Sequence, residues 1–170
     1  MFNAVAERFR VPLCWWRART VLTQDAVLAA AFSLLGFLPP LAAGGLRLGD
    51  LPVHRAGPLA VTLALAECLP LVVRRRWPAL GLAVVACAFT AYQLLGYPRS
   101  FSSAGLLLAL YAAGAYEASF RRELVAGATA SYLVLAVALA GLGATERPAD
   151  YAVFYLALCA CWGAGAFARS

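Results

Sequence analysis

The chain has 170 residues, 64% of them hydrophobic and only 13% charged, with a formal net charge of +6. Soluble domains usually contain roughly 45–50% apolar and about 25% charged residues, so this composition excludes an ordinary water-soluble domain. All of the basic residues are arginines. They flank apolar runs, which indicates the cytoplasmic face of a membrane and argues against a nucleic-acid-binding surface.

Residues 1–20 are predicted to form a basic, aromatic leader on the cytoplasmic side. Trp15 and Trp16 are followed by Arg17 and Arg19, a combination typical of the headgroup region of a bilayer. The leader is interpreted as a plain anchor, with a lipid-sensing interfacial helix as the alternative. Residues 21–170 are predicted to form a single transmembrane domain.

The first membrane-spanning helix is predicted over about residues 26–44, because an uncharged run of about 20 residues can cross a bilayer core. Pro39-Pro40 is expected to end this helix. A cleaved signal peptide, with small residues near Ala42, is the alternative. The polar loop that follows, Gly45–Gly57, is predicted to lie outside. It contains the only histidine, His54, interpreted as a solvated loop residue rather than a pH sensor.

The second crossing is predicted over residues 58–73 and contains a single charge, Glu67. Glu67 lies seven residues before Arg74, which places it roughly 10 Å deeper along a helix. An acid in hydrocarbon must face the protein interior or water. Glu67 is therefore the candidate sensing residue, or else a structural acid paired with Arg74 or with hydroxyls of neighbouring helices. Pro70, three residues later, is expected to free a backbone carbonyl and kink the helix.

Four further crossings complete a predicted all-α bundle of six transmembrane helices joined in short hairpins. Their ranges are about 78–96, 101–117, 124–143 and 151–168. Gly127 and Ser131 form a small-residue pair that permits close approach of two helices. Together with Gly163 and Gly165, this pair suggests self-association.

Arginines in short turns predict the orientation of the bundle, since such turns stay in the cytoplasm. The strongest determinants are Arg74, Arg75 and Arg76 in one turn and Arg121 and Arg122 in another. With six crossings, ten arginines fall inside and four outside. The prediction is therefore a multi-pass protein of the cell membrane with both termini cytoplasmic.

The sequence suggests no catalytic, cofactor-binding or metal-binding set. The cysteines are odd in number, five in all, and lie mostly within apolar runs, where cysteine behaves as a small hydrophobic residue. No phosphate-binding glycine loop, catalytic triad or cluster of metal ligands is present in the sequence. We therefore expect no cofactor and no catalysis by residues of this chain.

The layout resembles the membrane-embedded sensor half of actinobacterial two-component histidine kinases. The resemblance rests on the basic aromatic leader, on Leu69-Pro70-Leu71 followed by Arg74-Arg75-Arg76 and Trp77-Pro78, on a tyrosine-bearing helix with a basic turn over Tyr111–Arg122, and on Trp162-Gly163 in the last helix. It implies a homodimer in a lipid bilayer, joined to a cytoplasmic kinase core and, through it, to a response regulator. No catalytic residue is implied here, because the phospho-accepting histidine motif and ATP-binding domain of that family have no counterpart in this sequence.

The mechanism implied is mechanical: a stimulus in the bilayer or outer loops shifts helix packing, and the last helix passes a rotation or piston motion onward. Two alternatives remain open. One is a small transporter or channel-like protein, although such proteins usually show inverted repeats and several intramembrane polar groups. The other is a non-signalling membrane scaffold.

Overall fold

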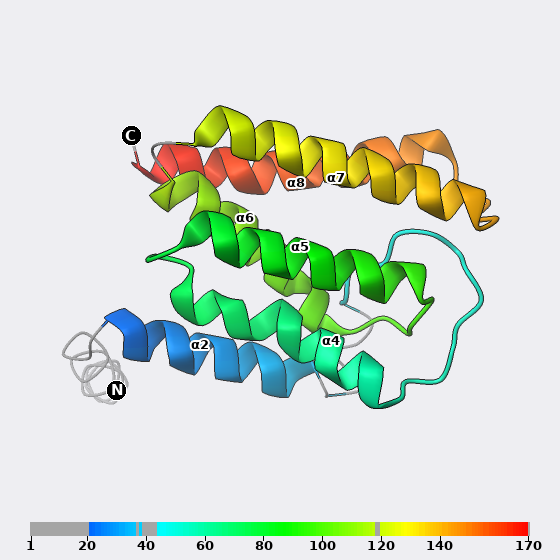
Figure 1. Ribbon diagram of the computed structural model, residues 1–170, viewed down its shortest axis with the longest axis horizontal. Coiled ribbons are helices and arrows are strands. Elements are labelled where there is room, and N and C mark those ends of the chain that lie inside the picture. Colours follow the sequence, from blue (N-terminus) through cyan, green and yellow to red (C-terminus); the bar gives the residue numbers. More distant parts are fainter. Residues whose placement is uncertain (1–20, 37, 39–43, 118–119, 170) are drawn as a thin grey trace, which may run out of the picture.

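In the computed structural model, the described residues are 21–36, 38, 44–117 and 120–169, and all of their regular structure is helical (Figure 1). The all-α class predicted from the sequence is therefore confirmed for this part of the chain. The predictions for the leader at residues 1–20, for Pro39-Pro40 and for a cleavage site near Ala42 fall outside the described residues.

The described helices are joined by short connections, except that a longer loop over residues 44–57 precedes Pro58. They are α2 (Val21–Gly36), α4 (Pro58–Cys68), the 3-10 helix η1 (Leu69–Val73), α5 (Pro78–Leu94), the 3-10 helix η2 (Phe101–Ala104), α6 (Gly105–Tyr116), α7 (Arg121–Gly141) and α8 (Pro148–Arg169). These helices overlap all six ranges predicted as crossings. The largest difference is at α2, which begins before the uncharged run and so includes Asp25.

The helices run back and forth between two ends of the molecule (Figure 1). At one end, here called the arginine end, lie the start of α2, the turn after η1, the end of α6, the start of α7 and the last turn of α8. At the other, the loop end, lie residues 44–57, 95–100 and 142–147. The loop end is fastened by hydrogen bonds between distant loops, among them Gly49 N–H to Glu146 Oε2 at 2.8 Å and His54 N–H to the Gly96 carbonyl at 2.8 Å.

The core lies around α5 and α6, where Val85, Phe89 and Ala113 are almost completely buried. Helix α8 packs along α6. This approach requires glycine on both helices. A Cβ at Gly114 would lie 2.3 Å from the Trp162 carbonyl oxygen, and one at Gly165 would lie 2.1 Å from that of Tyr111. Gly165 is therefore used inside the chain, whereas Gly127 and Gly163 face open space and are free for an external contact.

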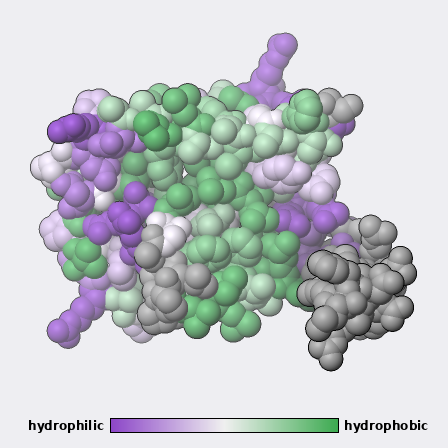
Figure 2. Space-filling model, turned by 180° about the vertical axis from the view of Figure 1, so that it is seen from behind, coloured by the Kyte–Doolittle hydropathy of each residue, from purple (hydrophilic) through white to green (hydrophobic). Residues whose placement is uncertain are grey.

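Apolar side chains cover the middle of the surface seen in Figure 2, and polar side chains gather at both ends. Helices α7 and α8 are long and apolar enough to cross a membrane. Only 17% of the most apolar 18-residue stretch of α7, and 6% of that of α8, is buried. A core helix of a soluble protein would be mostly buried. Helices α5, α6 with η2, and α4 with η1 are apolar but shorter.

Candidate functional site: a buried glutamate and a serine turn

Glu67, the candidate sensing residue, is completely buried in the last turn of α4. Its Oε2 lies 3.0 Å from the hydroxyl of Ser102, in the 3-10 helix η2. The backbones of the two segments are also close, since a Cβ at Gly105 would lie 2.6 Å from the Glu67 carbonyl oxygen. Of the two kinds of partner considered for Glu67, the structure has the hydroxyl of a neighbouring segment and not Arg74.

The serine turn connects Glu67 with two other parts of the chain. Ser102 Oγ lies 3.0 Å from Ser100 Oγ, and the Ser100 hydroxyl donates to the Gly36 carbonyl at 3.1 Å, at the end of α2. Ser103 Oγ donates to the Ser100 carbonyl and accepts the Leu46 N–H, both at 2.7 Å. All three serines are buried, so η2 begins inside the bundle rather than at its surface.

The number of protons in this chain of oxygens indicates the protonation state of Glu67. Three oxygen–oxygen contacts join Glu67 Oε2, Ser102 Oγ, Ser100 Oγ and the Gly36 carbonyl. The two hydroxyls supply only one proton each. A neutral Glu67 supplies the third and donates to Ser102, which then donates to Ser100. A charged Glu67 would instead accept a hydrogen bond from the Ser102 hydroxyl. With the Ser100 hydroxyl donating to the Gly36 carbonyl, no hydrogen would then lie between the two serine oxygens.

Glu67 Oε1 supports the same conclusion, because it is buried and has no hydrogen-bond partner among the described residues. A buried ionised carboxylate needs several donors or a cation, whereas a neutral carboxyl group costs less when one oxygen is unpaired. The arrangement therefore favours a neutral acid that holds a proton between α4 and the serine turn.

Arg74, the residue considered as a partner for Glu67, instead binds Asp25 on α2. Its Nε and Nη2 lie 3.1 and 2.8 Å from Asp25 Oδ1, and Arg75 Nε lies 3.1 Å from Oδ2. The Asp25 side chain is only 2% exposed. This ion-pair cluster was not predicted from the sequence. The signal present in the sequence was the position of Asp25, directly before the uncharged run that begins at Ala26. This position is near the membrane depth expected for the turn with Arg74–Arg76.

Pro70 lies in η1, where the helix that began at Pro58 changes from α to 3-10 geometry after Cys68. A proline cannot donate the backbone hydrogen bond that an α-helix needs, so this change replaces the kink expected from the sequence. The tighter turn brings Leu71 into the core and Arg74 to Asp25.

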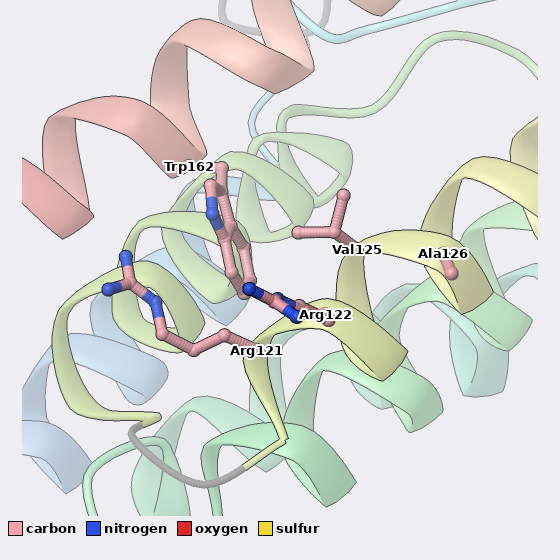
Figure 3. A pocket seen from close by; sticks show the side chains of 5 residues that line it. All are labelled: Arg121, Arg122, Val125, Ala126 and Trp162. Carbon is pink, nitrogen blue, oxygen red and sulfur yellow. The ribbon is translucent and has the colours of Figure 1, made fainter.

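Arg121 and Arg122, the other predicted orientation determinants, lie at the start of α7 beside a groove that also borders Trp162 of α8 (Figure 3). Arg76 is exposed in its turn. His54 is exposed in the long loop at the loop end. The structure thus separates the five predicted arginines into Arg74 and Arg75 bound to Asp25, Arg76 in its turn, and a pair on the groove.

Residues 13–170 match the family model described as "Domain of unknown function (DUF7134)". No curated protein matches this chain. No solved structure matches it either.

Proposed function

We propose that this chain, which belongs to the DUF7134 family, is a multi-pass membrane domain that acts as the signal-input half of a two-component histidine kinase. In this proposal six helical segments cross the bilayer, with the arginine end in the cytoplasm. The domain forms a homodimer, and a cytoplasmic kinase core connected to α8 phosphorylates a response regulator.

The distribution of charge supports the membrane placement. The turns containing Arg74–Arg76 and Arg121–Arg122 and the last turn of α8 with Arg169 share one end of the molecule (Figure 1). Short loops rich in arginine remain cytoplasmic. Between the two polar ends, large apolar side chains are exposed, including Val134 at 67% and Leu156 at 64%. Water would disfavour such a surface, whereas lipid matches it.

The observation that carries the signalling proposal is the position of α8. This helix ends at the arginine end and packs on the central helix α6 through the close contacts of Gly114 and Gly165. A change of packing in the core would therefore move α8 as a rigid rod. A rotation or piston shift of such a helix is a known way to pass a conformational change to a following element.

Varying the helical phase after α8 tests the signalling proposal. The chain would be joined through a continuous helix to the dimerisation and catalytic core of a histidine kinase, with none to four residues inserted after Arg169. Each insertion rotates the core by about 100° relative to α8. We expect autophosphorylation in vesicles to rise and fall with helical period. Activity independent of the insertion would contradict the proposal.

Accessibility of single cysteines tests the placement separately. In a variant lacking the native cysteines, His54→Cys should react with an impermeant maleimide in intact cells, and Arg76→Cys should react only after the membrane is opened. Both positions are exposed in the structure, so burial inside the chain cannot explain a difference. The reverse pattern would overturn the orientation, and equal labelling at both sites would contradict a fixed one.

A further inference from the structure

A groove of about 400 Å³ lies between α7 and α8 near the arginine end. Its walls are Val125 and Ala126 of α7 and Trp162 of α8, with the side chains of Arg121 and Arg122 at its polar edge (Figure 3). The hydrogen bonds and ring contacts that join the two helices in the described structure lie farther along, at Thr129 and Tyr132 of α7 and at Tyr151, Phe154 and Tyr155 of α8.

The two guanidinium groups at this groove have no carboxylate partner within the described part of the chain. The ion pairs there involve only Asp25 with Arg74 and Arg75. Glu123, the next residue along α7, is exposed and forms none of them. Two adjacent, uncompensated arginines beside an apolar groove favour a ligand that is anionic at one end and apolar along its length.

We propose that this groove binds an anionic phospholipid, with the headgroup phosphate on Arg121 and Arg122 and an acyl chain against Val125, Ala126 and Trp162. Guanidinium groups bind phosphate oxygens in a bidentate manner. Indole rings are favoured at the same membrane depth. The inference rests on the membrane placement proposed above and does not depend on the kinase proposal.

A lipid fits the groove better than a free phosphate because the groove is mostly apolar and continues onto exposed apolar surface. Seven and eleven residues after Ala126, on the same side of α7, Leu133 and Val137 are each more than half exposed. A soluble anion would use only the two arginines and leave the apolar walls uncovered.

The test compares lipids bound to the purified full chain by native mass spectrometry in a neutral detergent. The probes are dioleoyl phosphatidylglycerol, dioleoyl phosphatidylcholine and glycerol phosphate. An arginine near an anionic lipid surface contributes roughly fivefold to binding. We therefore expect Arg121→Gln/Arg122→Gln to weaken retention of phosphatidylglycerol roughly 25-fold. Retention of phosphatidylcholine should change little.

A matched control removes the same charge elsewhere: Arg76→Gln/Arg55→Gln, two exposed positions away from the groove, should retain phosphatidylglycerol like the native chain. Ala126→Leu keeps both arginines but fills the groove, and it should also weaken retention. Circular dichroism confirms that each variant is folded.

Three results would overturn the proposal: equal retention of phosphatidylglycerol by the Arg121→Gln/Arg122→Gln variant, equal loss in the control pair, or displacement of the lipid by glycerol phosphate at similar concentration. A chain that stays monodisperse in water and does not insert into vesicles would instead refute the membrane placement, and with it this inference.

Discussion

The two arginine turns at the same end of the molecule have different environments. Arg74 and Arg75 surround a buried carboxylate, Asp25, and join η1 to α2. Arg121 and Arg122 lie on the edge of a groove, with no carboxylate partner among the described residues. In sequence both turns show the same signal, adjacent arginines after an apolar run. One pair is used for internal packing, and the other leaves its charge available to an external group.

This difference teaches that an arginine turn can orient a membrane protein without being free to bind lipid. The positive-inside rule depends on where a charge lies during insertion. Later binding depends on whether a carboxylate has already neutralised that charge. Asp25 decides this for the first turn, so substitutions at Asp25 test the comparison most directly.

The largest expected effect is that of Asp25→Asn. The change leaves Arg74 and Arg75 without a negative partner at a site where the aspartate is 2% exposed. Breaking a buried ion pair from one side costs several kcal/mol. We expect a loss of about 3 kcal/mol in the free energy of unfolding, measured by titrating the protein from mild detergent into a denaturing one.

The control is Glu123→Gln at the other arginine turn. Glu123 is exposed, so the same acid-to-amide change should alter stability by less than about 0.5 kcal/mol. If the two variants are equally stable, the contrast between the turns is wrong.

The second prediction concerns α8, which forms one wall of the groove. Gly165→Ala would place a Cβ only 2.1 Å from the Tyr111 carbonyl oxygen. Helix α8 must therefore move away from α6. Overpacking of this kind costs about 1–3 kcal/mol. Gly163→Ala, two residues away in open space, should be neutral in the same unfolding titration. A neutral Gly165→Ala would show that α6 and α8 do not pack at this distance.

The helical ranges could be predicted from the sequence because each apolar run is bounded by proline, glycine or arginine, which have strong local preferences. Glu67 could be identified because an acid inside an apolar run is conspicuous. Its partner could not, since Ser102 comes from a segment 35 residues away and the depth at which η2 begins depends on tertiary packing. Asp25 was missed because the predicted first crossing begins after it, at residue 26, whereas its pairing with arginines allows α2 to include it.

The third prediction compares the two buried acids by the same substitution. Glu67 has a serine hydroxyl as its partner, whereas Asp25 has two arginines. Glutamine can donate to Ser102 as a neutral carboxyl group does, so Glu67→Gln should cost less than about 1 kcal/mol. An infrared band of a neutral carboxyl group should be present in the native chain and absent from Glu67→Gln. A cost as large as that of Asp25→Asn would indicate that Glu67 is ionised.

The smallest effect is expected at the loop end, where Asp50 is exposed and accepts hydrogen bonds from Thr145. The Thr145 hydroxyl and then its backbone N–H, at 2.6 Å from Oδ1, hold the pKa of Asp50 below its ordinary value of 3.8. A lowered folded-state pKa adds stability that is fully present above the unfolded-state pKa and is lost as pH falls through the folded-state pKa.

The melting temperature of the native chain should therefore fall more steeply than that of Asp50→Asn as the pH is lowered from about 5 through the ordinary pKa of aspartate. Thr145→Val removes the hydroxyl, the largest cause of the lowered pKa, but keeps the backbone N–H. It should reduce the difference only in part. Parallel acid profiles for the native chain and Asp50→Asn would show that Asp50 and Thr145 do not fasten the two loops. The difference should be smaller than the effect of Asp25→Asn, because an exposed hydrogen-bonded carboxylate is also stabilised by water in the unfolded chain.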